Sequence, residues 1–386
     1  MTSQATPQVT LDVPATRPLP PHQYGLVGRT LAALATPGGA VFVLAIALLL
    51  ATIAANPNFG DPGVIIRFMG RTAPIAIAAM GQYYVIVSGE FDLSMGAVIA
   101  TQVVMAGNLI GQDQDRILPV MVLMLLVGAG IGLVNGLVTT VLRVPSFITT
   151  LGMMLALGGL VRYLTGGAAT GNPHENFRKI GRGGIEDVPV VDVIPYPLLI
   201  LLVLCIASSV LMRRPFGRNL IAAGDNPEAS RVSGTPLWWL KTRAVILSSL
   251  SATVAGILLV GYAGVHPSIG SGYEFAAITA VVLGGVLLGG GRGWVLSAVA
   301  GAFALEMLFT LLTVLGVAST WRDTVQGVII IVAVAAAARA WQVGRRPRRG
   351  RSVTPPGDAV SPTPAAGSHE LGATTTPAPG TNTGDK

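Results

Sequence analysis

Three acidic residues within or beside long apolar stretches are the strongest candidates for chemistry in this chain. Glu90 and Asp92 lie in the segment V-S-G-E-F-D-L-S-M-G, at a break between two apolar runs, and Glu306 lies inside another apolar run. An acidic group at the centre of a bilayer costs about 2.5–3.5 kcal/mol on insertion scales, so it normally faces a protein interior or water. Glu306 is therefore a candidate for lining a solute path.

Two interpretations of Glu90 and Asp92 remain open. They can form part of a solute path or hinge, or they can cap the helix that begins near Leu93, with help from Ser94. Asn135, in the segment G-L-V-N-G-L, can likewise donate a hydrogen bond to another helix or face a path. The sequence does not separate these roles.

Several kinds of chemistry are excluded by residues that are missing or scattered. No G-x-x-x-x-G-K-[ST] phosphate loop is present, because no lysine follows a glycine ahead of serine or threonine. The histidines lie in separate loops and tails and the one cysteine lies in an apolar run, so neither a catalytic histidine relay nor a metal site is expected. These residues are His22, His174, His266, His369 and Cys205. We predict that the chain is not an enzyme and binds no metal or cofactor.

A polar loop at residues 213–243 lies between strongly apolar stretches and contains the segment N-P-E-A-S-R-V-S-G. We expect this segment to form a short capped helix, with Asn226 as the N-cap, Pro227 at the first helical position and Glu228 at the positive end of the helix dipole. Gly234 is expected to end it. A helix of about two turns that lies outside the membrane offers a surface on which another protein can dock, so we predict a docking surface here.

The run G-G-V-L-L-G-G-G-R-G at residues 284–293 superficially resembles a phosphate-binding loop. Such loops need a preceding strand and a helix that opens onto the ligand, whereas this run lies at the predicted exit of a membrane helix. We therefore expect these glycines to allow close packing and sharp turns.

The composition predicts an all-α polytopic membrane protein. Apolar residues make up 51% of the 386 residues and charged residues only 11%, unlike a soluble globular domain. The net charge of +7 comes from arginines in loops and a tail, so nucleic-acid binding is not expected. A bilayer requires about 20 mostly apolar residues per helix, and we count about ten such stretches. They are residues 38–55, 70–88, 94–111, 117–139, 145–165, 196–212, 243–263, 276–291, 294–316 and 323–341.

The positions of lysine and arginine predict the orientation, because short loops rich in these residues stay in the cytoplasm. Residues 213–243 and the C-terminal tail both carry such clusters, and four predicted spans separate them. Both termini are therefore expected in the cytoplasm. We divide the chain into a cytoplasmic N-terminal segment (1–37), a membrane domain (38–341) and a disordered cytoplasmic tail (342–386).

The loop at residues 166–195 must then lie outside, although it carries Arg178, Lys179 and Arg182. Acidic residues in the same loop offset these charges. The loop can cap a pore or meet a partner, or it can be a solvated connector, and both interpretations remain open.

The sequence contains a weak internal repeat. S-G-E-F-D at residues 88–92 precedes one span and S-G-Y-E-F at residues 271–275 precedes another, while V-P-S-F at residues 144–147 and V-A-S-T-W at residues 317–321 each follow two spans later. In the predicted topology the two copies face opposite sides of the membrane. This pattern indicates two halves related as an inverted repeat, with the solute route between them; chance is the alternative for matches this short.

Four segments together resemble the membrane permease subunits of ABC sugar importers of the ribose, xylose and galactoside type. They are G-E-F-D-L-S-M-G (89–96), V-P-S-F-I-T-T-L-G (144–152), F-G-R-N-L-I-A-A-G-D-N-P-E-A-S-R-V-S-G (216–234) and V-V-L-G-G-V-L-L-G-G-G-R-G (281–293). The resemblance implies a fold like that of the vitamin B12 importer permease, in the bacterial plasma (inner) membrane. It also implies a homodimer, a separate ATP-binding subunit that holds the ATP, and an extracytoplasmic sugar-binding protein.

In that family a loop with the pattern E-A-A-x-x-x-G forms a coupling helix that inserts into a groove of the ATP-binding subunit. The resemblance therefore assigns part of the polar loop to this coupling role. The implied coupling residues are Arg218, Asn226, Pro227, Glu228, Ala229, Ser230 and Gly234. Ser230 stands where the family has a second alanine, which is a small-for-small change.

The segment L-E-M-L-F-T at residues 305–310 departs from the family, which often has glycine and paired asparagines in this region. Glu306 and Phe309 are therefore assigned to the candidate substrate path together with Glu90, Asp92 and Asn135. The departure leaves nucleosides and branched-chain amino acids, which related permeases carry, as alternatives to a sugar.

We expect a permease subunit that moves a ribose-, xylose- or galactose-like monosaccharide into the cytoplasm with ATP hydrolysed by a partner. One rival is an ion-coupled secondary transporter that uses Glu306, Glu90 or Asp92 as a proton or sodium carrier. Such a carrier has no need of a docking loop. A scaffold or receptor without cargo is a second rival, and it leaves the intramembrane acids without a purpose.

Overall fold

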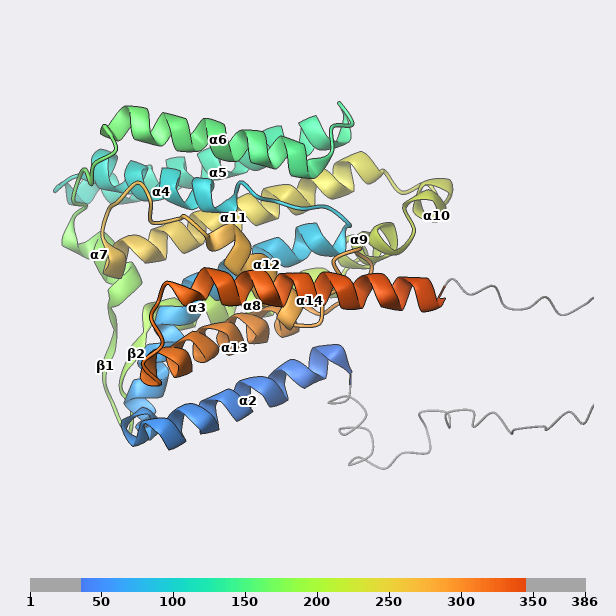
Figure 1. Cartoon of the computed structure of the whole chain (residues 1–386). Helices are drawn as coiled ribbons and strands as arrows, with labels where there is room; N and C mark the ends of the chain where they lie inside the picture. The colour runs from blue at the N-terminus through green and yellow to red at the C-terminus, as the bar shows by residue number, and fades with distance from the viewer. Residues whose placement is uncertain (1–35, 345–386) are drawn as a thin grey trace, which may run out of the picture. The chain divides into compact units, whose positions relative to one another are not determined.

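The computed structural model describes residues 36–344, so most of the expected N-terminal segment and tail lies outside the described residues. The described chain is mostly helical, as the composition predicted (Figure 1). The long helices are α2 (Pro37–Ala55), α3 (Pro62–Val87), α4 (Met95–Ile110), α5 (Ile117–Thr140), α6 (Ser146–Thr165), α8 (Tyr196–Arg213), α11 (Leu237–Ala263), α13 (Val295–Val314) and α14 (Trp321–Gly344). The shorter elements are η2 (Pro57–Gly60), η3 (Gln114–Arg116), α7 (Glu175–Arg182), β1 (Gly184–Val188), β2 (Asp192–Pro195), α9 (Pro215–Asp225), α10 (Pro227–Val232) and α12 (Tyr273–Leu283).

Seven helices in the described part of the chain are long and apolar enough to cross a membrane. They are α2, α3, α5, α6, α8, α11 and α13. Helices α4 and α12 contain 16 and 11 residues, fewer than the roughly 20 that a straight span requires. The structure thus supports a polytopic membrane protein, and the count of ten spans stays a prediction.

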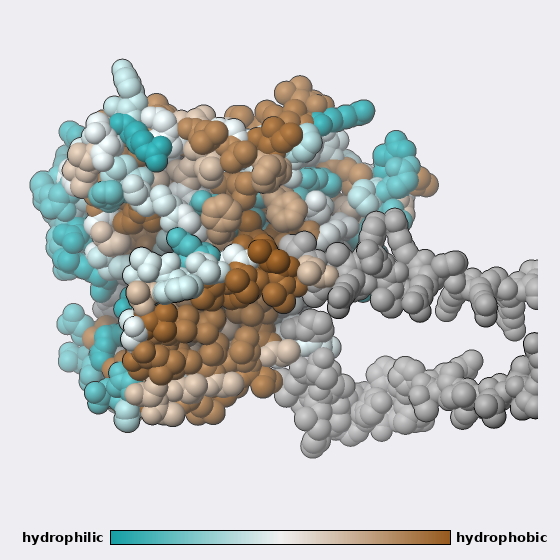
Figure 2. Space-filling view, in the orientation of Figure 1, coloured by the Kyte–Doolittle hydropathy of each residue, from teal (hydrophilic) through white to brown (hydrophobic). Residues whose placement is uncertain are grey.

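Helices α3 and α11 form the centre of the bundle, and most of their residues are buried. The outer helices expose large apolar side chains, among them Leu50 at 62% and Leu126 at 64%. Figure 2 shows a broad apolar surface over α2, α13 and α14, with polar residues gathered toward α7. A soluble protein does not leave so large an apolar surface exposed, so this surface fits lipid.

Figure 1 shows α9 and α10 at one end of the bundle and α7 with the β1–β2 hairpin at the other. We refer to these as the α10 end and the α7 end. The hairpin and α7 lie within residues 166–195, where the sequence predicted a loop. Phe177 of α7 is completely buried, and Gly181 packs closely on Gly261 of α11. This segment is therefore packed on the bundle, which a plain solvated connector would not be.

Helices α4 and α12 are short because the chain before each of them is not helical: residues 90–94 have no regular secondary structure, and residues 267–272 form turns. In Figure 1, residues 88–94 return from the α10 end toward the middle of the bundle before α4 begins, and residues 264–272 return from the α7 end before α12 begins. The N-terminal ends of the two helices meet there. A Cβ at Gly96 would collide with the backbone oxygen of Gly270 and the carboxylate of Glu274. The two copies of S-G-[EY] in the internal repeat, at residues 88–90 and 271–273, lie at these breaks.

The predicted span at residues 276–291 is too long. Helix α12 ends at Leu283, where the glycine-rich run begins. Gly285, Gly290 and Gly291 have φ angles of 75°, 85° and 75°, and this left-handed region is incompatible with a continuing right-handed helix. The apolar residues within the run made the span look longer in the sequence than the backbone allows.

Candidate functional site

The short capped helix predicted in the polar loop is confirmed as α10. The Asn226 side chain accepts a hydrogen bond from the backbone N–H of Ala229 at 3.0 Å, and Pro227 is the first helical residue. Gly234 has a φ of 83°, which glycine adopts without steric cost. The helix therefore begins and ends where its sequence places a cap and a stop.

Helix α10 presents a charged, exposed face. Arg231 donates to Glu228 at 2.6 Å, and both side chains are 69% exposed. This hydrogen bond lowers the pKa of Glu228 and raises the pKa of Arg231, so both remain charged at neutral pH. Ser230 is buried, whereas Val232 is 79% exposed. An exposed ion pair beside an exposed valine adds little to stability but suits contact with another protein.

Helix α9 holds α10 against the membrane helices, and its residue Arg218 is exposed. Gly224 of α9 packs so closely on the carbonyl of Val87 that a Cβ would collide with it. The same carbonyl accepts a hydrogen bond from the N–H of Gly291 at 2.9 Å. The glycine-rich run thus allows close packing between α9 and the end of α3, in agreement with the role expected from its sequence.

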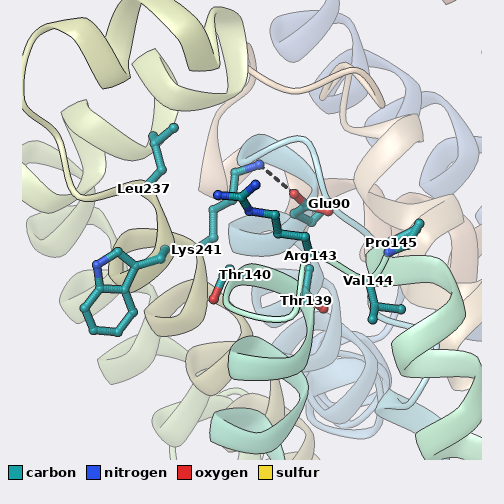
Figure 3. Close-up of a pocket in the computed structure, with 9 residues that line it drawn as sticks. Glu90, Thr139, Thr140, Arg143, Val144, Pro145, Leu237 and Lys241 are labelled. Carbon is teal, nitrogen blue, oxygen red and sulfur yellow. Dashed lines mark hydrogen bonds and ion pairs between the residues drawn. The ribbon is translucent and has the colours of Figure 1, made fainter.

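Residues 88–94, which follow α3, are tied to α11 by two polar contacts. Lys241 donates to Glu90 at 2.6 Å, and their side chains are only 17% and 18% exposed (Figure 3). Ser248 donates to Asp92 at 2.7 Å. Asp92 is completely buried and also accepts from the N–H and the hydroxyl of Ser94 at 2.9 and 2.6 Å.

The same segment is tied to α5 and α6. Asn135 is completely buried and donates to the Ser94 hydroxyl at 2.9 Å. The Ser146 and Thr150 hydroxyls accept from the backbone of this segment, each at 3.1 Å. The geometry places Asp92 and Asn135 in a buried network that supports the start of α4, and neither has surface open to a solute in this conformation.

Glu306 lies in a polar cluster nearer the α7 end. Its carboxyl group interacts electrostatically with Arg71 and Arg322, and with the hydroxyls of Tyr262 and Tyr273. The two tyrosines share a hydrogen bond, and Tyr262 also donates to the backbone oxygen of Arg71 at 3.4 Å. We call these five residues the Glu306 cluster. Its carboxylate, hydroxyls and guanidinium groups can hydrogen-bond a polar solute.

Phe309 lies beside this cluster but is nearly inaccessible, at 2% exposed. The guanidinium of Arg322 sits over its ring at 5.2 Å from the centroid. Phe309 therefore positions Arg322 in this conformation and does not itself face a path. Its predicted contact with substrate stays a prediction.

Sequence reasoning missed the partners of the acidic residues. Arg71, Tyr262, Tyr273 and Arg322 come from four different helices, and Lys241 reaches Glu90 across 151 positions. One signal was present for Lys241: a lysine four residues into an apolar helix needs a partner or water. The tyrosines carry no comparable local signal.

Three known permeases align with this chain over most of its length. The ribose import permease RbsC of Escherichia coli (strain K12) is 33% identical over 296 residues, which cover 76% of this chain and 91% of that protein. RbsC of Bacillus subtilis (strain 168) is 32% identical over 282 residues, or 72% and 86% of the two chains. The L-arabinose permease AraH of Escherichia coli (strain K12) is 32% identical over 304 residues, or 76% and 87%.

The family described as "Branched-chain amino acid transport system / permease component" matches residues 64–334. The match begins within α3 and ends within α14, so it includes the non-helical breaks before α4 and α12, helix α10 and the Glu306 cluster. No solved structure matches the chain.

Proposed function

Since the chain belongs to the branched-chain amino acid transport system permease family, we propose that it is the membrane subunit of a binding-protein-dependent ABC importer. Its relatives are import permeases for ribose and L-arabinose. The observation that carries the proposal is α10, a capped helix that projects from the bundle in a chain with no phosphate-binding motif of its own. A helix so placed fits a docking element for a separate ATP-binding subunit.

The proposed cargo is a monosaccharide of the ribose, xylose or galactose kind. The Glu306 cluster supports this choice, because carboxylate, tyrosine and arginine side chains match the hydroxyl groups of a sugar in donors and acceptors. The family description names branched-chain amino acids, and a cluster with both charges can also hold an amino acid. Competition for uptake between ribose, xylose, galactose and leucine separates these cargoes.

The α10 end is proposed to face the cytoplasm of a bacterial cell. The arginines and lysine of residues 213–243 all lie there, as the positive-inside rule requires. The α7 end then faces an extracytoplasmic sugar-binding protein, and α7 with the β1–β2 hairpin offers it a structured surface. A second copy of the chain completes the transporter in this proposal.

Two chains of contacts can transmit a movement of α10 into the bundle. Through α9, it reaches the carbonyl of Val87 at the end of α3. Through α11, which begins five residues after α10 ends, it reaches Glu90 by way of Lys241. Both routes converge on residues 88–94, the break before α4. We infer that this break converts motion of the ATP-binding subunit into a change in the solute path.

The two breaks also support the inverted-repeat hypothesis. Helices α4 and α12 run in opposite directions from the middle of the bundle (Figure 1), and each follows a non-helical segment. Discontinuous helices that meet near the midplane are typical of transporters built from inverted repeats. Glu274, at the start of α12, lies within electrostatic range of Asp92, so an acidic residue stands at each break.

Reconstitution in proteoliposomes tests the proposal against the ion-coupled rival. The chain alone should show no sugar uptake under a proton or sodium gradient, whereas addition of its ATP-binding subunit, binding protein and ATP should start uptake. In the complete system Glu306→Gln should change KM or rate while uptake stays ATP-dependent. Gradient-driven uptake by the chain alone, abolished by Glu306→Gln, would show a secondary carrier instead.

A further inference from the structure

A pocket of about 350 Å³ opens at the α10 end between the end of α5, the turn that precedes α6, Glu90 and the start of α11 (Figure 3). Polar and charged residues alternate around it with apolar ones. The lining residues are Glu90, Thr139, Thr140, Arg143, Val144, Pro145, Leu237, Trp238 and Lys241. The lining contains no residue of the Glu306 cluster or of α10, and Glu90 is its one residue from the candidate substrate path.

The pocket has an excess of positive charge. Its one carboxylate, Glu90, is paired with Lys241 at 2.6 Å, and Arg143 has no ion pair among the described residues. Figure 3 shows the Arg143 side chain extending into the pocket on the side of the Glu90–Lys241 pair. Two cations and one carboxylate leave a net charge of +1, which favours an anion.

Hydrogen-bond donors accompany this charge. The Thr139 hydroxyl is buried and has no partner within the described residues, although such groups are normally satisfied. Thr140, beside it, is already bonded to the Gly136 carbonyl at 2.7 Å. A guanidinium, an ammonium and a free hydroxyl in one pocket form a donor set suited to phosphate oxygens.

The backbone of Arg143 also points to a use for its side chain. Its φ is 57°, in the left-handed region where helix ends usually carry glycine because other residues pay a steric cost. The position tolerates arginine despite that cost. Unfavourable backbone conformations of this kind concentrate at functional sites.

Exposed apolar residues near the pocket indicate that its anionic ligand belongs to a membrane lipid. Trp238, which lines the pocket, is 50% exposed, and Val141 and Leu142, between the lining residues Thr140 and Arg143 in the chain, are 56% and 68% exposed. Exposed aliphatic residues beside a tryptophan are typical of the level where acyl chains meet headgroups. Basic pockets between membrane helices on the cytoplasmic side bind anionic lipid headgroups.

We propose that this pocket binds the phosphate group of an anionic membrane phospholipid through Arg143, Lys241 and Thr139. The proposal rests on the proposed orientation, with the α10 end in the cytoplasm, and does not depend on the cargo. Because Lys241 is shared between the phosphate and Glu90, a bound headgroup would compete with the contact that ties residues 88–94 to α11. Binding of an anionic lipid would thereby change how residues 88–94, the break before α4, are held on α11.

Native mass spectrometry of the full chain tests the proposal, after purification from nanodiscs of phosphatidylcholine with or without phosphatidylglycerol. Arg143→Gly removes the guanidinium and relieves the φ of 57°, so this variant should melt at or above the wild-type temperature in phosphatidylcholine. It should bind phosphatidylglycerol about fivefold more weakly than the wild type, whereas Arg143→Lys should bind as the wild type does. Arg162→Gln, at the α7 end of α6, is the matched control and should change nothing.

Two results would overturn the proposal. If Arg143→Gly retains as much phosphatidylglycerol as the wild type, the pocket is not the site. If inorganic phosphate in phosphatidylcholine nanodiscs raises the wild-type melting temperature as much as phosphatidylglycerol does, and Arg143→Gly abolishes that rise, the pocket takes a free phosphate and the lipid assignment is wrong. Stabilisation by phosphatidylglycerol alone, lost in Arg143→Gly, supports the lipid assignment.

Discussion

Glu90 and Lys241 connect the break before α4 to the helix that follows α10, and both side chains are largely buried at the edge of the pocket. Their side chains are 18% and 17% exposed, so loss of one partner leaves the other charge poorly solvated. We expect Glu90→Gln to lower the free energy of unfolding by about 1–3 kcal/mol and to reduce ATP-driven uptake. Thermal unfolding and proteoliposome uptake measure the two effects.

The double variant Glu90→Lys with Lys241→Glu should recover part of both losses, because it restores the pair with its charges exchanged. Glu175→Gln is a matched control. It breaks the pair with Arg182 at the α7 end, where the side chains are 48% and 42% exposed, so it should change stability less than Glu90→Gln does. Equal losses in Glu90→Gln and Glu175→Gln would contradict the special role of the Glu90–Lys241 pair.

At the scale of single residues, the sequence predicts which residues are unusual but not which residues they contact. An acid in an apolar run is visible locally, which is why Glu306, Asp92 and Glu90 stood out. Their partners come from helices far away in the chain, such as Ser248 for Asp92 at a separation of 156 positions. Those contacts depend on how α11 packs, which local sequence does not encode.

At the scale of elements, the meeting point of α4 and α12 allows a direct test. Gly96→Ala should lower the free energy of unfolding by about 1–3 kcal/mol, because its new methyl group would overlap Gly270 and the Glu274 carboxylate. Gly130→Ala in α5 is the matched control. It has no neighbour within 4 Å of an added Cβ, so it should leave stability unchanged or raise it by about 0.5–1 kcal/mol.

Thermal unfolding of the two glycine variants in the same detergent provides the measurement. A Gly96→Ala protein as stable as Gly130→Ala would mean that the two short helices do not meet as described. Loss of stability confined to Gly96→Ala would support the close contact between the two breaks.

Elements with strong local signals were predictable, and others were not. Helix α10 has a cap, a proline at its first position and a glycine stop, and its limits followed from these residues. The end of α12 was misplaced because apolar residues continue into the glycine-rich run. Helix α7 and the β1–β2 hairpin are too short for a periodic pattern, and their packing depends on the buried Phe177.

At the scale of the whole molecule, composition and hydropathy were sufficient to predict a helical membrane protein. They could not fix the number of spans, because the segments before α4 and α12 cross part of the bundle without forming α-helix. The arrangement that results places α10 at one end, the Glu306 cluster toward the other, and the two breaks between them. In the proposed function, energy input at α10 and cargo binding at the Glu306 cluster are separated along the bundle and connected through residues 88–94.

The central claim is that α10 transmits ATP hydrolysis by a partner to this bundle. The most direct measurement is ATP-driven sugar uptake, together with retention of the ATP-binding subunit, by a chain whose residues 227–232 are replaced by glycine and serine. The control chain carries the same replacement at residues 189–191, in the β1–β2 turn at the α7 end. We expect the α10 replacement to lose the ATP-binding subunit and uptake, and the control to keep the ATP-binding subunit. Full uptake and full retention of the subunit without α10 would contradict the account.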